Sequence, residues 1–121
     1  MFSHIKTSKE NKEVVTQLTN KLNLGAENVI ARIALVYSLA QEEKLDLNDL
    51  KDSGGKEYSK NVLFGENMEA YSGMICVKYN LHHSDNDIPK YIKMHLDHGL
   101  YLLKKSEQID ILDLLSHCLN N

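Results

Sequence analysis

The chain has 121 residues, 14 basic and 17 acidic side chains and a formal net charge of −3. This length suits one domain, and contents of 42% hydrophobic and 26% charged residues exclude a disordered or fibrous protein. No apolar run approaches the roughly 18 residues of a membrane span, and the first residues read as neither a secretory signal nor a transit peptide, so we expect a cytoplasmic protein.

The N-terminus predicts a short strand in front of two helices. Residues 2–7 alternate, so that His4 and Lys6 are expected to face outward and Ile5 inward. A strand, a capped helix and a second helix in this order are typical of ribbon-helix-helix DNA-binding proteins. Those proteins pair strands from two chains and lay the ribbon on the duplex. The pattern therefore predicts a ribbon-helix-helix-like N-terminal half.

The two helices differ in character. The first begins at a capping box, with Thr7 as the N-cap and Glu10 three residues later, and it is predicted over about residues 8–22. The second is predicted over about residues 26–41 and has almost no polar face. Such a helix is a central one, covered by its own chain or by a partner.

The rest of the chain is predicted to be mainly helical. Residues 42–66 are polar and irregular, although the stretch 58–64 has residue types that suit a short strand. Further helices are predicted over about residues 67–81, from an N-cap at Asp87 to about residue 105, and from a cap at Ser106 onward. The resulting prediction is a compact single domain over residues 1–121, mainly α, with about five helices, a short N-terminal strand and a second short strand near residues 58–64.

Histidines provide one candidate chemistry. His95 and His98 can share a helical face, and His82 lies in the preceding loop, so a metal site is one interpretation. The preferred interpretation is a set of partly exposed polar histidines, because the sequence lacks a His-Glu-x-x-His motif and a close cysteine pair. We therefore expect neither a metal nor a cofactor.

The nucleophiles and the glycine-rich loop do not assemble an active site. Cys76 and Cys118 lie in apolar helical patterns and are interpreted as reduced, inert core thiols. The loop from Ser53 to Lys56 contains Gly-Gly-Lys, which is interpreted as a flexible turn or, alternatively, as a contact to phosphate through its backbone N–H groups. The chain is predicted not to be an enzyme.

Nucleic-acid binding is the remaining candidate function. Because the net charge is negative, such binding requires a local basic patch. The only arginine, Arg32, lies on the apolar second helix, where we expect it to pair with an acid or, alternatively, to reach a phosphate. Surface lysines are either merely solvated or bind the DNA backbone. The lysines chosen for that contact, on charge alone, are Lys6, Lys9, Lys12, Lys21, Lys56 and Lys60.

The whole run of the chain resembles the DndE family of DNA sulfur modification proteins, which act in bacterial phosphorothioation. The stretches that carry the resemblance are residues 5–10 (IKTSKE), residues 28–35 (NVIARIAL), residues 63–65 (LFG) and the closing helices. The resemblance implies a helical homo-oligomer, with a tetramer expected, that binds the DNA backbone and favours nicked duplex. It also implies a non-enzymatic subunit that works with a cysteine desulfurase, a reductase-like sulfur-transfer protein and an ATPase.

Three functions remain open. The favoured one is a DNA-binding subunit whose affinity falls as salt rises. The second is a structural adaptor that docks the sulfur-transfer and ATPase subunits through its apolar and acidic helices without itself holding DNA. The third is a small enzyme or metal protein built on His82, His95 and His98.

Overall fold

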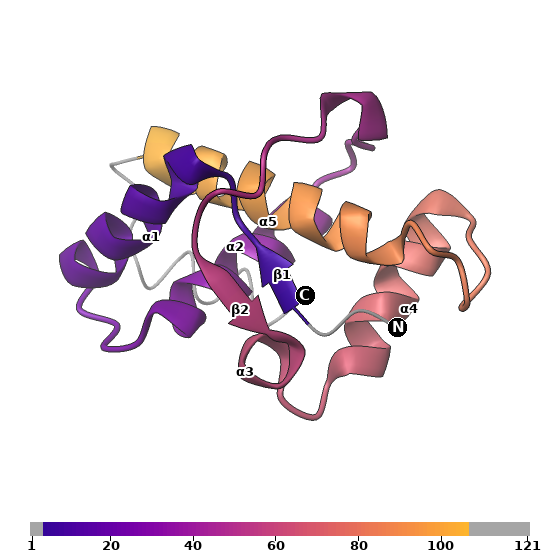
Figure 1. Cartoon of the computed structure of the whole chain (residues 1–121), viewed down its shortest axis with the longest axis horizontal. Coiled ribbons are helices and arrows are strands. Elements are labelled where there is room, and N and C mark those ends of the chain that lie inside the picture. The colour runs from indigo at the N-terminus through magenta and orange to yellow at the C-terminus, as the bar shows by residue number, and fades with distance from the viewer. Residues whose placement is uncertain (1–3, 107–121) are drawn as a thin grey trace.

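The computed structural model describes residues 4–106 and confirms a mainly helical fold with a small two-stranded antiparallel sheet (Figure 1). The predicted helix after Ser106 lies outside the described residues. No described helix combines the length and the apolar character needed to cross a membrane. The elements in chain order are β1 (His4–Lys6), α1 (Lys9–Lys21), α2 (Glu27–Leu39), the 3₁₀ turn η1 (Leu47–Asp49), β2 (Glu57–Ser59), α3 (Lys60–Phe64), α4 (Met68–Tyr79) and α5 (Ile88–Lys105).

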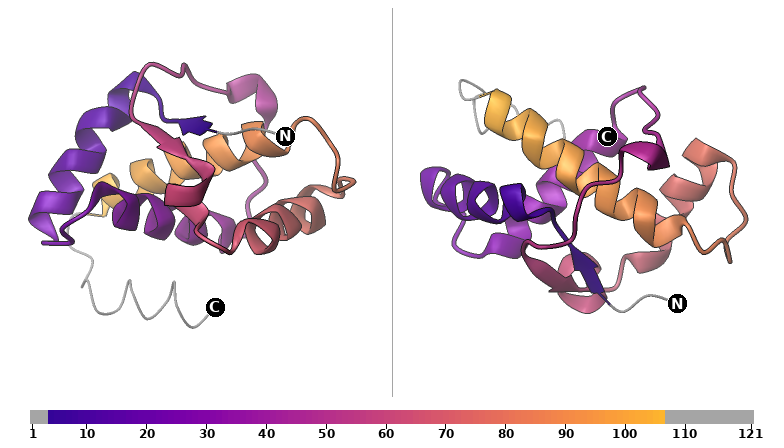
Figure 2. Two further views of the ribbon diagram at one scale, coloured as in Figure 1. Left: turned by 60° about the horizontal axis from the view of Figure 1, so that its bottom comes forward. Right: turned by 45° about the horizontal axis from the view of Figure 1, so that its top comes forward.

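Helices α2 and α5 form the centre of the fold, with α1 beside one end of α5 and α4 beside the other (Figure 1, Figure 2). Ile30, Ala31 and Leu35 of α2 are fully buried, which confirms the prediction of a central helix. Its cover comes from its own chain. The two helices are in close contact. Gly99 of α5 permits this approach, because a Cβ atom at that position would collide with the carbonyl group of Ala34.

The predicted N-terminal strand is present, and its partner belongs to the same chain. β1 pairs antiparallel with β2, and Ile5 lies opposite Tyr58. Both of these side chains are buried, whereas His4 and Lys6 are exposed as the alternation predicted. The ribbon is therefore built within one chain, unlike the two-chain ribbon of the ribbon-helix-helix plan.

The second predicted strand is correct only at its beginning, because residues 60–64 form helix α3. The hydroxyl group of Ser59 accepts a hydrogen bond from the backbone N–H of Val62 at 3.2 Å and so caps the start of this helix. Arg32 binds its other end, donating from Nε to the carbonyl of Leu63 at 2.6 Å and from Nη2 to that of Val62 at 2.8 Å. Arg32 therefore binds helix-terminal carbonyls of its own chain, whereas the sequence predicted an acid at an interface or a phosphate as its partner.

The start of α1 differs from the prediction in its N-cap residue, and that of α5 differs in its capping hydrogen bond. Ser8, not Thr7, is the N-cap of α1, and its hydroxyl accepts from the backbone N–H three residues later. Thr7 is unavailable because its hydroxyl already accepts the backbone N–H of Lys56 at 2.8 Å. Asp87 holds the N-cap position of α5 as predicted, but its side chain makes no capping hydrogen bond and contacts Lys90 at 3.2 Å.

A buried carboxylate of α5, paired with a lysine of the same helix, also binds the start of α1. Lys93 Nζ lies 2.6 Å from Asp97 Oδ2, one turn along α5, and both side chains are buried. The other carboxylate oxygen accepts hydrogen bonds from the backbone N–H of Ser8 at 3.0 Å and from Asn11 Nδ2 at 2.8 Å. A carboxylate at this place also suits the positive end of the α1 dipole. Asp97 thus holds the first turn of α1 against α5.

Candidate nucleic-acid interface

The predicted lysines fall into two separate groups. Lys6, Lys56 and Lys60 lie on or beside the small sheet, whereas the other three lie on α1. On α1, Lys12 and Lys21 are nine positions apart, which at about 100° per residue places them on opposite sides of the helix. The structure therefore does not bring the six lysines together on one surface.

Two of the three lysines on or beside the sheet have acidic partners. Lys6 Nζ lies 3.8 Å from a carboxylate oxygen of Glu57, and Lys56 Nζ lies 3.3 Å from one of Glu27. A hydrogen bond from the Thr16 hydroxyl at 2.7 Å, together with Lys56, lowers the pKa of Glu27. Glu27 therefore carries its charge at neutral pH, and the sheet surface supplies its own counter-charges.

The glycine-rich loop uses its backbone donors within the chain. The N–H of Gly55 donates to the carbonyl of Thr7 at 3.0 Å, and the N–H of Lys56 donates to the Thr7 hydroxyl. The N–H of Gly54 donates to Asp52 Oδ2 at 3.0 Å. The loop is fastened to the start of α1, and these N–H groups do not point at a free anion site.

A cationic groove lies between α1 and the carboxyl-terminal half of α5. Two hollows of about 450 Å³ and about 400 Å³ form it, and they adjoin because Glu10 and Lys104 line both. We call this surface the α1–α5 groove. Its charged and aromatic lining residues are Lys9, Glu10, Glu13, Lys51, Tyr101, Lys104 and Lys105.

Positive charge predominates in the groove, with four lysines against two glutamates. Lys51 and Glu10 approach to 3.8 Å, but both side chains are largely exposed, so water screens the pair. Lys105 Nζ lies 5.3 Å from the ring centroid of Tyr101, a residue that is 43% exposed. The other two groove lysines, Lys9 and Lys104, have no ion-pair partner within residues 4–106.

Of the six lysines chosen from the sequence, only Lys9 lines this groove. Sequence reasoning missed Lys51, which comes from the segment after η1, and the last two lysines of α5. A signal was nevertheless present, because Lys104 and Lys105 follow Tyr101 by three and four positions and so share its helical face. Lysines at the C-terminal end of a helix are also explained by the helix dipole, so their presence does not by itself indicate a binding surface.

The histidine pair of α5 belongs to a buried hydrogen-bond chain. His95 Nδ1 and His98 Nδ1 each lie 2.8 Å from Ser38 Oγ. The Tyr79 hydroxyl lies 2.7 Å from His95 Nε2 and accepts the backbone N–H of Leu45 at 2.9 Å. All three hydrogen bonds have a donor if Tyr79 donates to His95, His95 donates to Ser38, and Ser38 donates to His98. This order leaves a proton on His98 Nε2.

The environment of these histidines favours a neutral, structural role. Burial, aided by the nearby charges of Lys78 and His98, lowers the pKa of His95 to about 3. Burial also lowers the pKa of His98. Within residues 4–106, no group of three or more His, Cys, Asp or Glu side chains is placed to hold a metal ion. Cys76 is half-buried against the core, and Cys118 lies outside the described residues.

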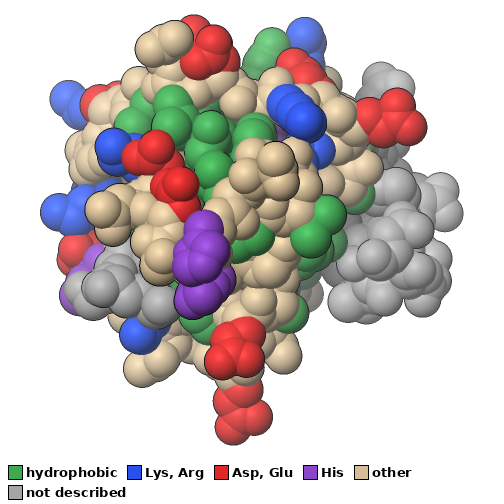
Figure 3. All heavy atoms as spheres, turned by 90° about the vertical axis from the view of Figure 1, so that its right-hand side faces the viewer, with side chains coloured by type: hydrophobic (Ala, Val, Ile, Leu, Met, Phe, Trp, Pro, Cys, Tyr) green, Lys and Arg blue, Asp and Glu red, His purple; other side chains and the backbone are tan. Residues whose placement is uncertain are grey.

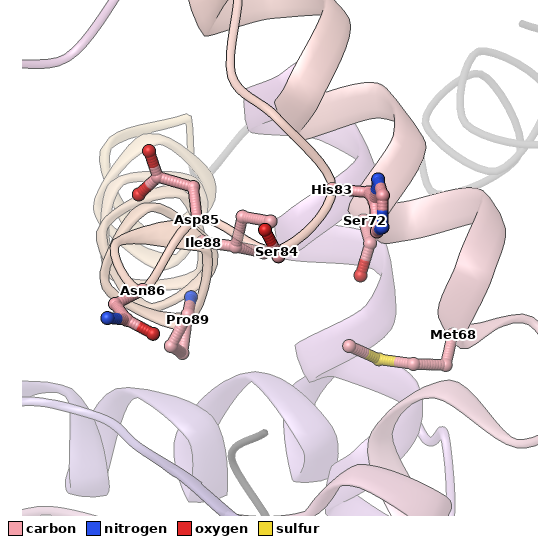
Figure 4. A pocket seen from close by; sticks show the side chains of 8 residues that line it. All are labelled: Met68, Ser72, His83, Ser84, Asp85, Asn86, Ile88 and Pro89. Atoms are coloured by element: carbon pink, nitrogen blue, oxygen red, sulfur yellow. The ribbon is translucent and has the colours of Figure 1, made fainter.

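Another hollow, of about 320 Å³, lies at the opposite end of α5 (Figure 4). Met68 extends toward it from α4, while His83 and Ser72 lie on one side and Asp85 and Asn86 on the other. Its polar groups do not converge on one point. On the face at this end of the molecule, lysine and arginine side chains are scattered among acidic ones (Figure 3). This end therefore does not offer a cationic surface.

Comparison with known proteins adds evidence of a different kind. The family model described as DNA sulphur modification protein DndE matches residues 4–110 of the chain. Among solved structures, the chain is similar to the crystal structure of DndE from Escherichia coli B7A, whose description says that it is involved in DNA phosphorothioation modification. That match has a TM-score of 0.68 at 17% sequence identity, and it covers 85% of this chain and 98% of the other. No curated protein matches the chain.

Proposed function

Because this chain belongs to the DndE family of DNA sulphur modification proteins, we propose that it is a non-catalytic subunit that holds the DNA backbone during phosphorothioation. The observation that carries this proposal is the α1–α5 groove, a concave surface with four lysines on a chain whose net charge is negative. Lysines that contact phosphates position a protein without reading bases. Binding to many DNA sequences with similar affinity is therefore expected.

The proposal includes assembly and a preferred form of DNA. A homo-oligomer, expected to be a tetramer, repeats the groove and multiplies a local charge that is modest in one copy. A nick makes a duplex easier to bend, so a concave cationic surface favours nicked over intact duplex. The partners proposed from the family are a cysteine desulfurase, a sulfur-transfer protein and an ATPase, in a cytoplasmic setting.

The groove lysines are proposed as the primary contact and the sheet lysines as a secondary one. Lys6 and Lys56 each have a carboxylate within 4 Å, so a phosphate must compete with that carboxylate for them. Lys9 and Lys104 have no such competitor among the described residues. Replacing groove lysines should therefore weaken DNA binding more than replacing sheet lysines.

The test is duplex binding across a salt series with a charge-matched control. The double variant Lys104→Glu/Lys105→Glu changes the groove, whereas Lys44→Glu/Lys90→Glu makes the same charge change at exposed positions outside it. For wild type, the logarithm of affinity should fall linearly with the logarithm of salt concentration. The groove variant should lower that slope by roughly 1.8 if two phosphate contacts are lost, at about 0.9 per phosphate. The control should keep the wild-type slope.

Two outcomes would contradict the proposal. Equal loss in both variants would mean that overall charge, not the groove, governs binding. No binding at low salt by a folded oligomer would leave the adaptor function in its place, in which the partner subunits hold the DNA. Equal affinity for nicked and intact duplex would remove only the proposed preference.

A further inference from the structure

Tyr101 separates the cationic groove from a smaller hollow of different character. That hollow has a volume of about 210 Å³, and its apolar lining comes from Leu45, Met94 and the Tyr101 ring. Tyr101 and Lys51 also line the 450 Å³ part of the groove, so the two spaces meet at these residues. One aromatic ring thus stands between a cationic space and a largely apolar one.

We propose that these two spaces together bind one nucleotide unit, with its base in the 210 Å³ hollow and its phosphate in the groove. The hollow is smaller than the roughly 300–1,000 Å³ of sites that enclose whole small-molecule ligands, so it suits a fragment such as a single base. An exposed aromatic ring stacks on any base, because every base has a π-face. The lysine over the ring, Lys105, adds a charge directly beside the base site.

Charge sets the orientation of the nucleotide. The 210 Å³ hollow is lined by Asp49, whose carboxylate repels a phosphate, and by Asp97, whose charge is paired with Lys93. Lys104 and Lys105 lie on the other side, in the groove. The phosphate therefore enters the groove, and the base enters the hollow. His98 also lines the hollow, so its imidazole and the Asp49 carboxylate offer hydrogen bonds to the edge of the base.

A base inside a duplex cannot enter this hollow, so the nucleotide must be unpaired. Unstacking a base costs least where it is already unpaired, as at a strand end, in a gap or in single-stranded DNA. Free nucleotides present the same chemistry without any unstacking. Where the nucleotide belongs to DNA, this inference rests on the proposed backbone-binding function and adds a base site to it.

The experiment uses the full-length protein and DNA that carries the fluorescent base 2-aminopurine. The probe base is placed in a single strand, at a gap in a duplex, or fully paired within an intact duplex. Stacking on Tyr101 should quench the unpaired probe in wild type and in Tyr101→Phe, and leave the paired probe unchanged. Tyr101→Leu removes the ring at a position that is already 43% exposed, so it should fold normally, which circular dichroism verifies.

The expected effect is a loss of quenching in Tyr101→Leu and an affinity for the single strand about five- to a hundred-fold weaker. Its affinity for intact duplex should fall less than its affinity for the single strand, because a paired base cannot stack on the ring. Persistent quenching and unchanged single-strand affinity in Tyr101→Leu would overturn the base site. In that case, salt-sensitive duplex binding that is lost in Lys104→Glu/Lys105→Glu would leave the proposed function standing.

Adenosine monophosphate distinguishes the two sources of the nucleotide. Competition by millimolar mononucleotide that depends on Tyr101 would support the site and identify free nucleotides as ligands. Binding of that kind without any DNA binding would support the site while contradicting the proposed function. Quenching by strands without competition by the mononucleotide would identify the unpaired nucleotide of a DNA strand. Absence of both forms of binding in wild type would overturn the inference.

Discussion

Replacing Asp97 by asparagine should strongly destabilise the protein, because the change removes the counter-charge of a buried lysine. The carboxylate lies 2.6 Å from Lys93 Nζ, and the two side chains are only 5% and 8% exposed. Its other oxygen accepts hydrogen bonds from Ser8 and Asn11 of α1. Asparagine keeps the shape of the side chain, but its NH₂ group must face either the ammonium group or the two donors of α1.

The expected cost is about 3–5 kcal/mol, the usual result of removing one partner from a buried ion pair. A domain of this size unfolds with a free energy of about 5–15 kcal/mol, so the change takes a large share of the total. An exposed ion pair at the start of the same helix provides a comparison for this cost. Lys90 and Asp87 approach to 3.2 Å at the surface, and Asp87→Asn should cost no more than about 1 kcal/mol.

The assay is urea unfolding followed by circular dichroism at pH 7 for wild type, Asp97→Asn and the control Asp87→Asn. A third variant, Lys93→Met/Asp97→Leu, removes both buried charges together. It should recover part of the lost stability, because no unpaired charge remains in the interior. If Asp97→Asn unfolds within about 1 kcal/mol of wild type, the buried pair does not hold α1 against α5, and the reasoning is refuted.

Three further predictions concern the interior. Gly99→Ala places a methyl group against the carbonyl of Ala34. It should lower the free energy of unfolding by at least about 1–3 kcal/mol in thermal unfolding, despite the better helix propensity of alanine. An unchanged Tm would show that α2 and α5 separate easily. The pKa of His95, about 3 in the folded protein, lies below its ordinary 6.5, so the folded state binds fewer protons and stability is lost as pH falls from 6.5 toward 3. Urea titrations should show about 2 kcal/mol of this loss between pH 7 and pH 5, and His95→Gln should flatten the dependence. Arg32→Met leaves the Leu63 carbonyl without its donor and should cost about 1–3 kcal/mol in urea, whereas wild-type stability would mean that another donor replaces it.

Local patterns in the sequence were sufficient to predict α1, α2, α4 and α5, although not the short helix α3. The run of apolar residues in α2 predicted a central helix, and its buried residues confirm it. The alternation around Ile5 predicted a strand with one buried face, which β1 has. The strand predicted over residues 58–64 is mostly a helix. Its β-type residues adopt this conformation because Ser59 caps the start of the helix and Arg32 binds its last carbonyls. The partner of Arg32 lies about 30 positions away, beyond the reach of a local pattern.

The sequence by itself therefore determined the helical class, the buried faces and the candidate lysine Lys9. Only the tertiary structure decided that Lys51 and the lysines that end α5 share a groove with it, and that Tyr101 divides this groove from an apolar hollow. The physical reason is that hydrophobic periodicity records how one segment meets solvent and core, over a few neighbouring residues. Which distant segments meet depends on packing between elements, here on Asp97 holding α1 and on a glycine that lets α5 approach α2.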